Sequence, residues 1–189
     1  MLNIYIQQNI SQSNTCNNWN GSCSQRFNIY GNNTFVAVSL SGSIFTSTDG
    51  ITWTSRTSGT TTNLWEVAYG NGTFVAVGET GTILTSSDNG LSWDNRTSGT
   101  SNHLYGVTYG NNTFLTVGYN GIIMKSTDNG TTWDNATSPT ANALGGIGFG
   151  NNTFVAVGSS GNIVRSTDNG SSFDNITSPT ANTINGVAF

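Results

Sequence analysis

The sequence contains few charged residues. Asp, Glu, Lys and Arg make up 7% of the 189 residues, and five basic against nine acidic side chains leave a formal net charge of -4. Proteins that bind nucleic acid need clustered Lys and Arg to neutralise phosphates, so this composition argues against nucleic acid as a partner. The chain still has material for a packed core, because 34% of its residues are hydrophobic and it contains five Trp, six Tyr and nine Phe.

Long apolar runs and a secretion leader are also lacking. No apolar run reaches the roughly 18 residues that a membrane-spanning helix needs, so we expect no membrane insertion. The first residues, MLNIYIQQNISQ, have neither the basic start nor the apolar stretch of a signal peptide. The abundance of Asn, Ser, Thr and Gly is common on secreted and virion-surface proteins. We therefore expect an extracellular or virion-surface location, with a leader removed before residue 1 or another export route.

Metal-binding residues are scarce too. The sequence has two cysteines, Cys16 and Cys23, and a single histidine, His103. Nothing near the cysteines completes a metal site, so we expect no metal and no cofactor. In an extracellular protein the two cysteines would form a local disulfide. Two free thiols in a reducing compartment are the alternative.

What the sequence does contain is a repeat. The 40 residues from Tyr109 match the 40 residues from Phe149 at 23 positions without a gap, and further copies begin at Tyr30 and Tyr69. Each copy predicts four short strands, as in LWEVAYG, TFVAVG, GTILTSS and LSWDNRTS of residues 64–98, separated by turns rich in Asn and Gly. The second strand is apolar on both faces and must be covered on both sides. Four-stranded units of about 40 residues are typical of β-propeller blades.

The frame of the repeat predicts five blades in a single all-β domain. The last residues, Thr183–Phe189, align with the first strand of a blade, and the chain begins near the second strand. Laying Met1–Tyr5 over Phe35–Ser39 also places Trp19 on Trp53. We expect repeats at about 26–63, 64–103, 104–143 and 144–182, and a composite blade of 1–25 plus 183–189. A truncated larger propeller and a two-chain ring are the alternatives.

Each copy carries one further motif: STDGITW, SSDNGLSW, STDNGTTW and STDNGSSF. These segments resemble the Asp-box, or BNR repeat, S-x-D-x-G-x-[ST]-W, of sialidases, photosystem assembly factors and other propellers. The resemblance implies a hairpin between the third and fourth strands, away from the central site. The first copy departs by being one residue shorter, and the fourth by ending in Phe. The corresponding positions are Asp49 and Trp53, Asp88 and Trp93, Asp128 and Trp133, and Asp168 and Phe173.

We interpret the Asp-box residues as structural. An Asp in a turn accepts hydrogen bonds from the backbone N–H groups just ahead of it. The Gly adopts a conformation that other residues avoid, and the aromatic ring covers the turn. Calcium binding is the functional alternative, but the motif lacks the clustered carboxylates of a tight oxygen cage.

The carboxylates outside the Asp-box argue against an enzyme. Three further aspartates, Asp94, Asp134 and Asp174, share one repeat position, which leaves only Glu66 and Glu79. Glycosidases need two carboxylates flanking one bond. The sialidase resemblance would also imply an arginine cluster and a Tyr nucleophile, and the four arginines do not look convergent. We expect no catalytic residues.

The turns that differ between copies are the candidates for binding. In a propeller, the turns after the second strand and the connections between blades share the face opposite the Asp-boxes, and scaffolds carry function on such variable loops. The candidates are Trp65, Glu79, His103, Tyr105 and Tyr119; ordinary surface drift between copies is the alternative. We expect a non-catalytic binding or adhesion module, a lectin-like propeller that resembles five-bladed tachylectins in architecture and takes a glycan or protein surface. A virion, filament or surface component that self-associates, or an assembly factor, is the alternative.

Overall fold

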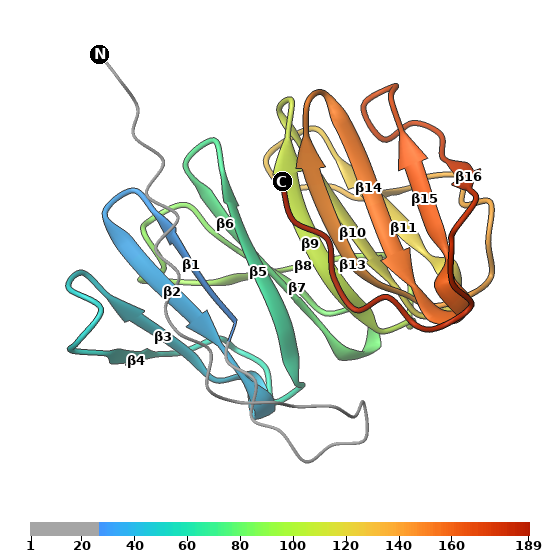
Figure 1. Cartoon of the computed structure of the whole chain (residues 1–189). Helices are drawn as coiled ribbons and strands as arrows, with labels where there is room; N and C mark the ends of the chain where they lie inside the picture. The colour runs from blue at the N-terminus through green and yellow to red at the C-terminus, as the bar shows by residue number, and fades with distance from the viewer. Residues whose placement is uncertain (1–26) are drawn as a thin grey trace.

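The structure is a computed structural model and describes residues 27–189. It contains four sheets, each of four antiparallel strands in sequence order. Figure 1 shows the four sheets side by side in an arc. The expected all-β fold built of four-stranded antiparallel units is confirmed. The expected strands of residues 1–25, and Cys16 and Cys23, lie outside the described residues.

We call the four sheets blades 1 to 4. Blade 1 comprises β1 (Phe27–Gly31), β2 (Thr34–Val38), β3 (Ile44–Ser47) and β4 (Thr54–Arg56). Blade 2 comprises β5 (Leu64–Gly70), β6 (Thr73–Gly78), β7 (Ile83–Ser86) and β8 (Asp94–Arg96). Blade 3 comprises β9 (Leu104–Gly110), β10 (Thr113–Gly118), β11 (Ile123–Ser126) and β12 (Asp134–Asn135). Blade 4 comprises β13 (Leu144–Gly150), β14 (Thr153–Gly158), β15 (Ile163–Ser166) and β16 (Asp174–Ile176).

The turn after the second strand of each blade is a short 3-10 turn: η1 (Leu40–Gly42), η2 (Glu79–Gly81), η3 (Tyr119–Gly121) and η4 (Ser159–Gly161). Its middle residue has a positive φ, for example 56° at Asn120, and a glycine with positive φ follows. These turns and the connections between blades form the face that we call the loop face.

No helix among residues 27–189 is long and apolar enough to cross a membrane.

Two strand predictions are wrong at their first residues. The third strand of blade 2 begins at Ile83 rather than Gly81, because Gly81 belongs to η2. The fourth strand begins at Asp94 rather than Leu91. The N–H of Ser92 donates to Asp88 Oδ1 at 2.9 Å, so this amide stabilises the Asp-box turn and does not join the ladder.

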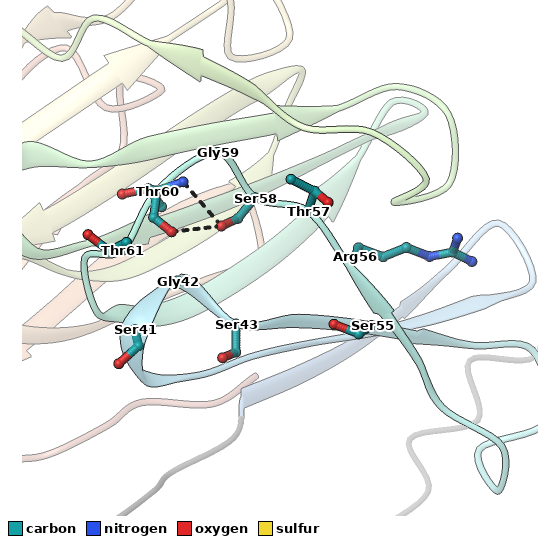
Figure 2. A pocket seen from close by; sticks show the side chains of 10 residues that line it. All are labelled: Ser41, Gly42, Ser43, Ser55, Arg56, Thr57, Ser58, Gly59, Thr60 and Thr61. Carbon is teal, nitrogen blue, oxygen red and sulfur yellow. Dashed lines mark hydrogen bonds between the residues drawn. The ribbon is translucent and has the colours of Figure 1, made fainter.

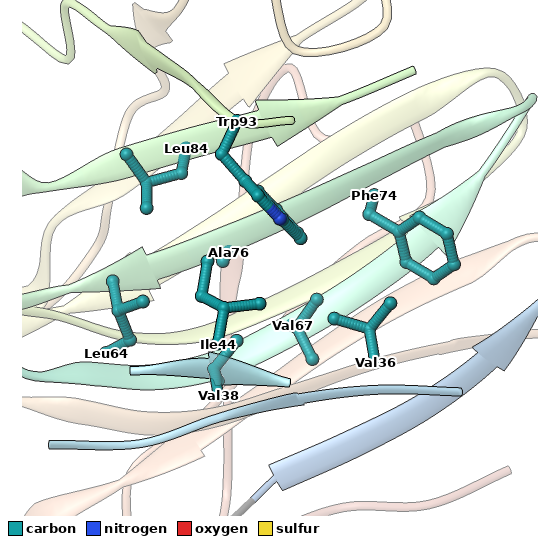
Figure 3. Packing of buried hydrophobic residues seen from close by; sticks show 9 residues of the cluster. All are labelled: Val36, Val38, Ile44, Leu64, Val67, Phe74, Ala76, Leu84 and Trp93. Atoms are coloured by element: carbon teal, nitrogen blue, oxygen red, sulfur yellow. The ribbon is translucent and has the colours of Figure 1, made fainter. Parts of the chain in front are cut away.

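Packing between blades forms the core. Figure 3 shows the cluster between blades 1 and 2, where Val36, Val38 and Ile44 meet residues of blade 2 that include Phe74 and Trp93. All six residues of β6 are buried, as expected for a strand covered on both faces. Removing a buried aromatic side chain such as Phe74 typically costs about 3–5 kcal/mol.

The first strands of the blades stack on one another through glycines. A Cβ at Gly70 would lie 2.0 Å from the Tyr109 ring of the next blade, and a Cβ at Gly110 would lie 2.2 Å from the Phe149 ring. No side chain fits at these positions, so glycine permits the close approach of neighbouring blades. The same contact recurs at the end of the chain, where a Cβ at Gly150 would lie 2.2 Å from the Phe189 ring.

Residues 183–189 thus lie where the first strand of a further blade would lie. The N–H of Ile184 donates to Gly158 O at 3.0 Å. The equivalent bond between blades 1 and 2 joins Leu64 N and Ser39 O at 3.2 Å. No regular strand forms over 183–189, in contrast to the expectation. Such a strand pairs with the second strand of its own blade, and none is present among residues 27–189.

Candidate functional site

The aspartate of each Asp-box forms hydrogen bonds within its own hairpin. In blade 3, Asp128 Oδ1 accepts from Ser126 Oγ at 2.8 Å and from Thr132 N at 2.9 Å, and Asp128 Oδ2 accepts from Thr132 Oγ1 at 2.6 Å. The N–H of Gly130 donates to Ser126 Oγ at 2.9 Å, and Trp133 Nε1 donates to Gly130 O at 2.9 Å. The Asp128 carboxylate therefore stabilises the hairpin turn in which it lies.

Hydrogen bonding also makes these carboxylates poor bases. Backbone hydrogen bonds from Thr52 and Ile51, together with the Ser47 hydroxyl, lower the pKa of Asp49 to about 2. The hydroxyl and backbone N–H of Ser172 lower the pKa of Asp168 as well. A carboxylate whose ionised form is stabilised in this way is a weak proton acceptor. The Asp-box has the wrong electrostatics for general-base catalysis near neutral pH.

Each Asp-box after the first also packs against the preceding blade. A Cβ at Gly90 would lie 2.9 Å from Thr46 Cγ2 of blade 1. Trp93, Trp133 and Phe173 are 9%, 8% and 6% exposed. In the first box, Trp53 is 37% exposed, because no blade precedes blade 1 within residues 27–189. The motif therefore stabilises both its own hairpin and the junction between blades.

On the loop face, side chains from the connections between blades hold the 3-10 turns. Asn63 Oδ1 accepts from Ser41 N at 2.9 Å, and Asn63 Nδ2 donates to Glu79 Oε1 at 2.8 Å. One blade further on, His103 Nδ1 accepts from Thr80 N at 3.1 Å. This bond requires the tautomer with its proton on Nε2 when the imidazole is neutral. His103 and Asn63 thus have the same role at consecutive junctions.

The structure brings four of the five candidate binding residues together where blades 2 and 3 meet. The His103 ring lies 6.2 Å from the Tyr105 ring and 6.4 Å from the Tyr119 ring. Burial raises the pKa of Tyr105, and the neighbouring Tyr119 and Glu79 raise it further. Both of these side chains therefore act electrostatically on Tyr105. Tyr119 is 48% exposed. The group offers an aromatic surface, an imidazole and a carboxylate to a partner.

The fifth candidate, Trp65, lies one blade earlier. Its position and that of Tyr105 are equivalent, since both lie where the register between the first and second strands shifts by one residue. Such bulges re-aim a side chain. The Nε1 atom of Trp65 is buried and has no hydrogen-bond partner.

One acidic residue with an unusual environment was not predicted. Glu66 lies on β5, and its Oε2 accepts from Val107 N of the next blade at 2.8 Å. The side chain as a whole keeps some exposed surface, yet burial of its carboxyl raises the pKa to about 7. Glycine occupies the equivalent positions 106, 146 and 186. A single Glu at a position that is Gly in three of the other four copies, and Phe27 in blade 1, was the signal in the sequence.

A hollow lies elsewhere on the molecule. It has a volume of about 610 Å³ beside η1, and its lining is rich in Ser and Thr. Figure 2 shows Ser58 bonded to Thr60 at its edge and the Arg56 side chain extending away from it. A hollow of about 510 Å³ occupies the equivalent place in blade 4. Because it recurs at equivalent positions, we attribute this hollow to the geometry of the repeat.

The described part of the chain has no metal-binding cluster, and its arginines are spread over the blades. Residues 27–189 contain no group of three His, Cys, Asp or Glu side chains placed to hold a metal ion. Arg56, Arg96 and Arg165 lie on β4, β8 and β15 of three different blades. Arg96 pairs with Asp94 at 3.0 Å within its own strand.

Solved structures with a similar fold are β-propellers. YCF48 from Cyanidioschyzon merolae has a TM-score of 0.69 at 17% identity, over 88% of this chain and 60% of that chain. A GH74 enzyme of Niastella koreensis has a TM-score of 0.58 at 23% identity, over 75% of this chain and 22% of that chain. A chain of a nidogen–laminin complex has a TM-score of 0.61 at 13% identity, over 79% of this chain and 62% of that chain.

These similarities show a β-propeller fold. This chain spans less than two thirds of each of those three structures, and the identities are too low to carry over an activity. No protein family and no curated protein matches the sequence.

Proposed function

We propose that this protein is a non-catalytic binding or adhesion module that presents its loop face to a glycan or to a protein surface. The observation that carries the proposal is the gathering of Glu79, His103, Tyr105 and Tyr119 at one junction of that face. Aromatic and polar side chains at one spot are typical of ligand sites. The opposite face carries the Asp-boxes, whose carboxylates bond within their own turns and whose Asn side chains bond to the preceding blade.

The proposed scaffold is a five-bladed ring of the Asp-box type, closed by both chain ends. Phe189 against Gly150 repeats the contact between Tyr109 and Gly70, which supports residues 183–189 as the first strand of a fifth blade. Residues 1–25 supply its other three strands. Closure would cover Trp53 and leave no open sheet face at either end of the arc.

We favour binding over catalysis, because most carboxylates of residues 27–189 bond to neighbouring protein groups, whereas glycosidases use two carboxylates that flank the scissile bond. Of the aspartates, Asp49, Asp88, Asp128 and Asp168 are engaged in the Asp-boxes. Glu66 lies at the junction of two inner strands and bonds to a backbone N–H. The proposed location is extracellular or on a virion surface, and the proposed partners exclude nucleic acid.

An assembly or structural role is the second candidate. It is favoured by the similarity to YCF48, which one solved structure presents bound to a D1 peptide. It is also favoured by the exposed Trp53, which would suit contact with another chain if the ring were not closed internally. This role predicts a stable complex with another protein or self-association into a large species, either of which light scattering would detect.

Binding to a glycan array and a surface-protein array tests the proposal. We expect saturable binding that is lost in the triple variant Trp65→Ala, Tyr105→Ala, Tyr119→Ala. Tyr30→Ala is the matched control, because Tyr30 is 53% exposed but lies at the turn between β1 and β2, away from the loop face. Absence of binding on both arrays, or equal loss in the control, would refute the proposal.

A further inference from the structure

We propose that a neutral sugar ring binds where blades 3 and 4 meet on the loop face, stacked on Tyr119, with one sugar oxygen accepting a hydrogen bond from the backbone N–H of Asn120. This inference rests on the proposed binding function and gives it a place and a ligand class. It derives from a difference between equivalent junctions of the repeat.

At two of the four 3-10 turns, a side chain from the following connection satisfies the N–H of the middle turn residue. In η1, Ser41 N donates to the side chain of Asn63, 22 residues later, at 2.9 Å. In η2, Thr80 N donates to the side chain of His103, 23 residues later, at 3.1 Å. Both turn residues have a positive φ, of 54° and 50°. In both cases a side chain from the next connection supplies the acceptor.

The third junction lacks this acceptor. Asn120 is the middle residue of η3 and has the same backbone conformation, with a φ of 56°. The residue 23 positions later is Ala143, whose methyl group cannot accept a hydrogen bond. The turn fixes the direction of the Asn120 N–H group. Because Asn120 is exposed, a ligand oxygen can reach this group. That oxygen would take the place of Asn63 Oδ1 or His103 Nδ1.

Side chains are also missing beside this N–H group. Gly145 occupies the bulge position that holds Trp65 and Tyr105 in the two preceding blades. Ala143 and Gly145 have no side chain of the size of Asn63 and Trp65, their equivalents in blade 2. Tyr119 directly precedes Asn120 and is 48% exposed. Its ring centroid lies 6.4 Å from that of His103 in an edge arrangement, and much of the Tyr119 ring is open to a ligand.

A neutral sugar fits this combination best. A sugar ring presents an apolar face to an aromatic ring and surrounds it with oxygens that can accept from a single N–H group. The nearby η4 residues Ser159 and Ser160 add hydroxyl groups. Within residues 27–189, the basic side chains Arg56, Arg96, Lys125 and Arg165 all lie on third or fourth strands, so no Lys or Arg of the described residues favours an acidic ligand at this junction. A peptide carbonyl is the competing acceptor, and the experiment separates the two.

The test is a titration of the isotopically labelled full chain with methyl glycosides of glucose, galactose, mannose and N-acetylglucosamine, followed by amide NMR shifts. We expect at least one glycoside to shift the Asn120 amide in a saturable manner. Ala143→Asn restores the acceptor found at Asn63 and should weaken the affinity about tenfold, as expected for the loss of one well-placed hydrogen bond. Asn63→Ala is the matched control at the first junction and should leave that affinity unchanged.

Three results would overturn the inference. If a glycoside binds and Ala143→Asn has no effect, the proposed place is wrong although the binding function stands. If no glycoside binds but the protein array finds a partner, the sugar assignment is wrong and the binding function again stands. If neither glycosides nor proteins bind, the proposed function fails together with the inference.

Discussion

Replacing Glu66 by Gln should change how the stability of the protein depends on pH. Burial raises the pKa of Glu66 from 4.5 to about 7. A group with a raised pKa in the folded state binds its proton more tightly there than in the unfolded chain. The stabilisation of the folded state that results is fully present below pH 4.5 and is lost as the pH rises through 7.

The size of this loss follows from the shift in pKa. One pKa unit corresponds to about 1.36 kcal/mol, so ionising Glu66 costs up to about 3 kcal/mol of unfolding free energy. Gln keeps an oxygen that can accept from Val107 N, now 2.8 Å from Glu66 Oε2, but it cannot become charged. We therefore expect the variant to match the wild type at pH 4.5 and to exceed it by up to about 3 kcal/mol at pH 9.

Urea unfolding of both proteins at pH 4.5, 6, 7.5 and 9 measures the difference directly. Subtracting the two curves removes the contributions of groups they share, including the Asp-box carboxylates, whose stabilisation is lost as the pH falls. Glu79→Gln is the control, because Glu79 lies on the loop face and is bonded to Asn63. A pH-independent difference between wild type and Glu66→Gln would refute the assignment of a buried, protonated Glu66.

Four further substitutions test the repeat. Asp128→Ala should cost about 1 kcal/mol in urea unfolding, because Asp128 is exposed and water can replace its hydrogen bonds; ligand binding by the folded protein should not change. Gly70→Ala should prevent folding, since its Cβ would lie 2.0 Å from the Tyr109 ring, and a native circular dichroism spectrum would contradict this. Trp93→Ala should lower the free energy of unfolding by about 3–5 kcal/mol. Trp53→Ala should cost nearly as much if residues 1–25 cover that ring in a closed propeller, and much less if Trp53 is as open as in the arc; thermal unfolding distinguishes the two cases.

The repeat explains why so much of the fold could be predicted. Four copies of one pattern restrict the strands, the turns and the covering of both strand faces. The differences from the prediction lie at strand ends and at residues 183–189, which form no regular strand among the described residues. Leu91 was assigned to a strand because it follows a turn signal, but the Asp88 carboxylate uses the adjacent amide of Ser92 for the turn. Competition between a side chain and the ladder for one N–H group is not visible in residue patterns.

The candidate site was predictable as a set of residues but not as an arrangement. Variation between copies indicated His103, Tyr105 and Tyr119, yet only the structure reveals that His103 bonds to the turn before it. The buried position of Glu66 depends on the approach of β9 to β5 in space. The Asn120 N–H group, for which Ala143 provides no acceptor, likewise becomes visible only when the junctions are compared in three dimensions.

We expect partners to bind at the loop face and the Asp-box face to stabilise the hairpins and the junctions between blades. Amide NMR shifts caused by a partner found on the arrays distinguish these two roles. We expect shifts in the turns 79–81 and 119–121 and in residues 103–105, with little change at the Asp-box hairpins 86–93 and 126–133. Shifts centred on those hairpins would contradict this expectation.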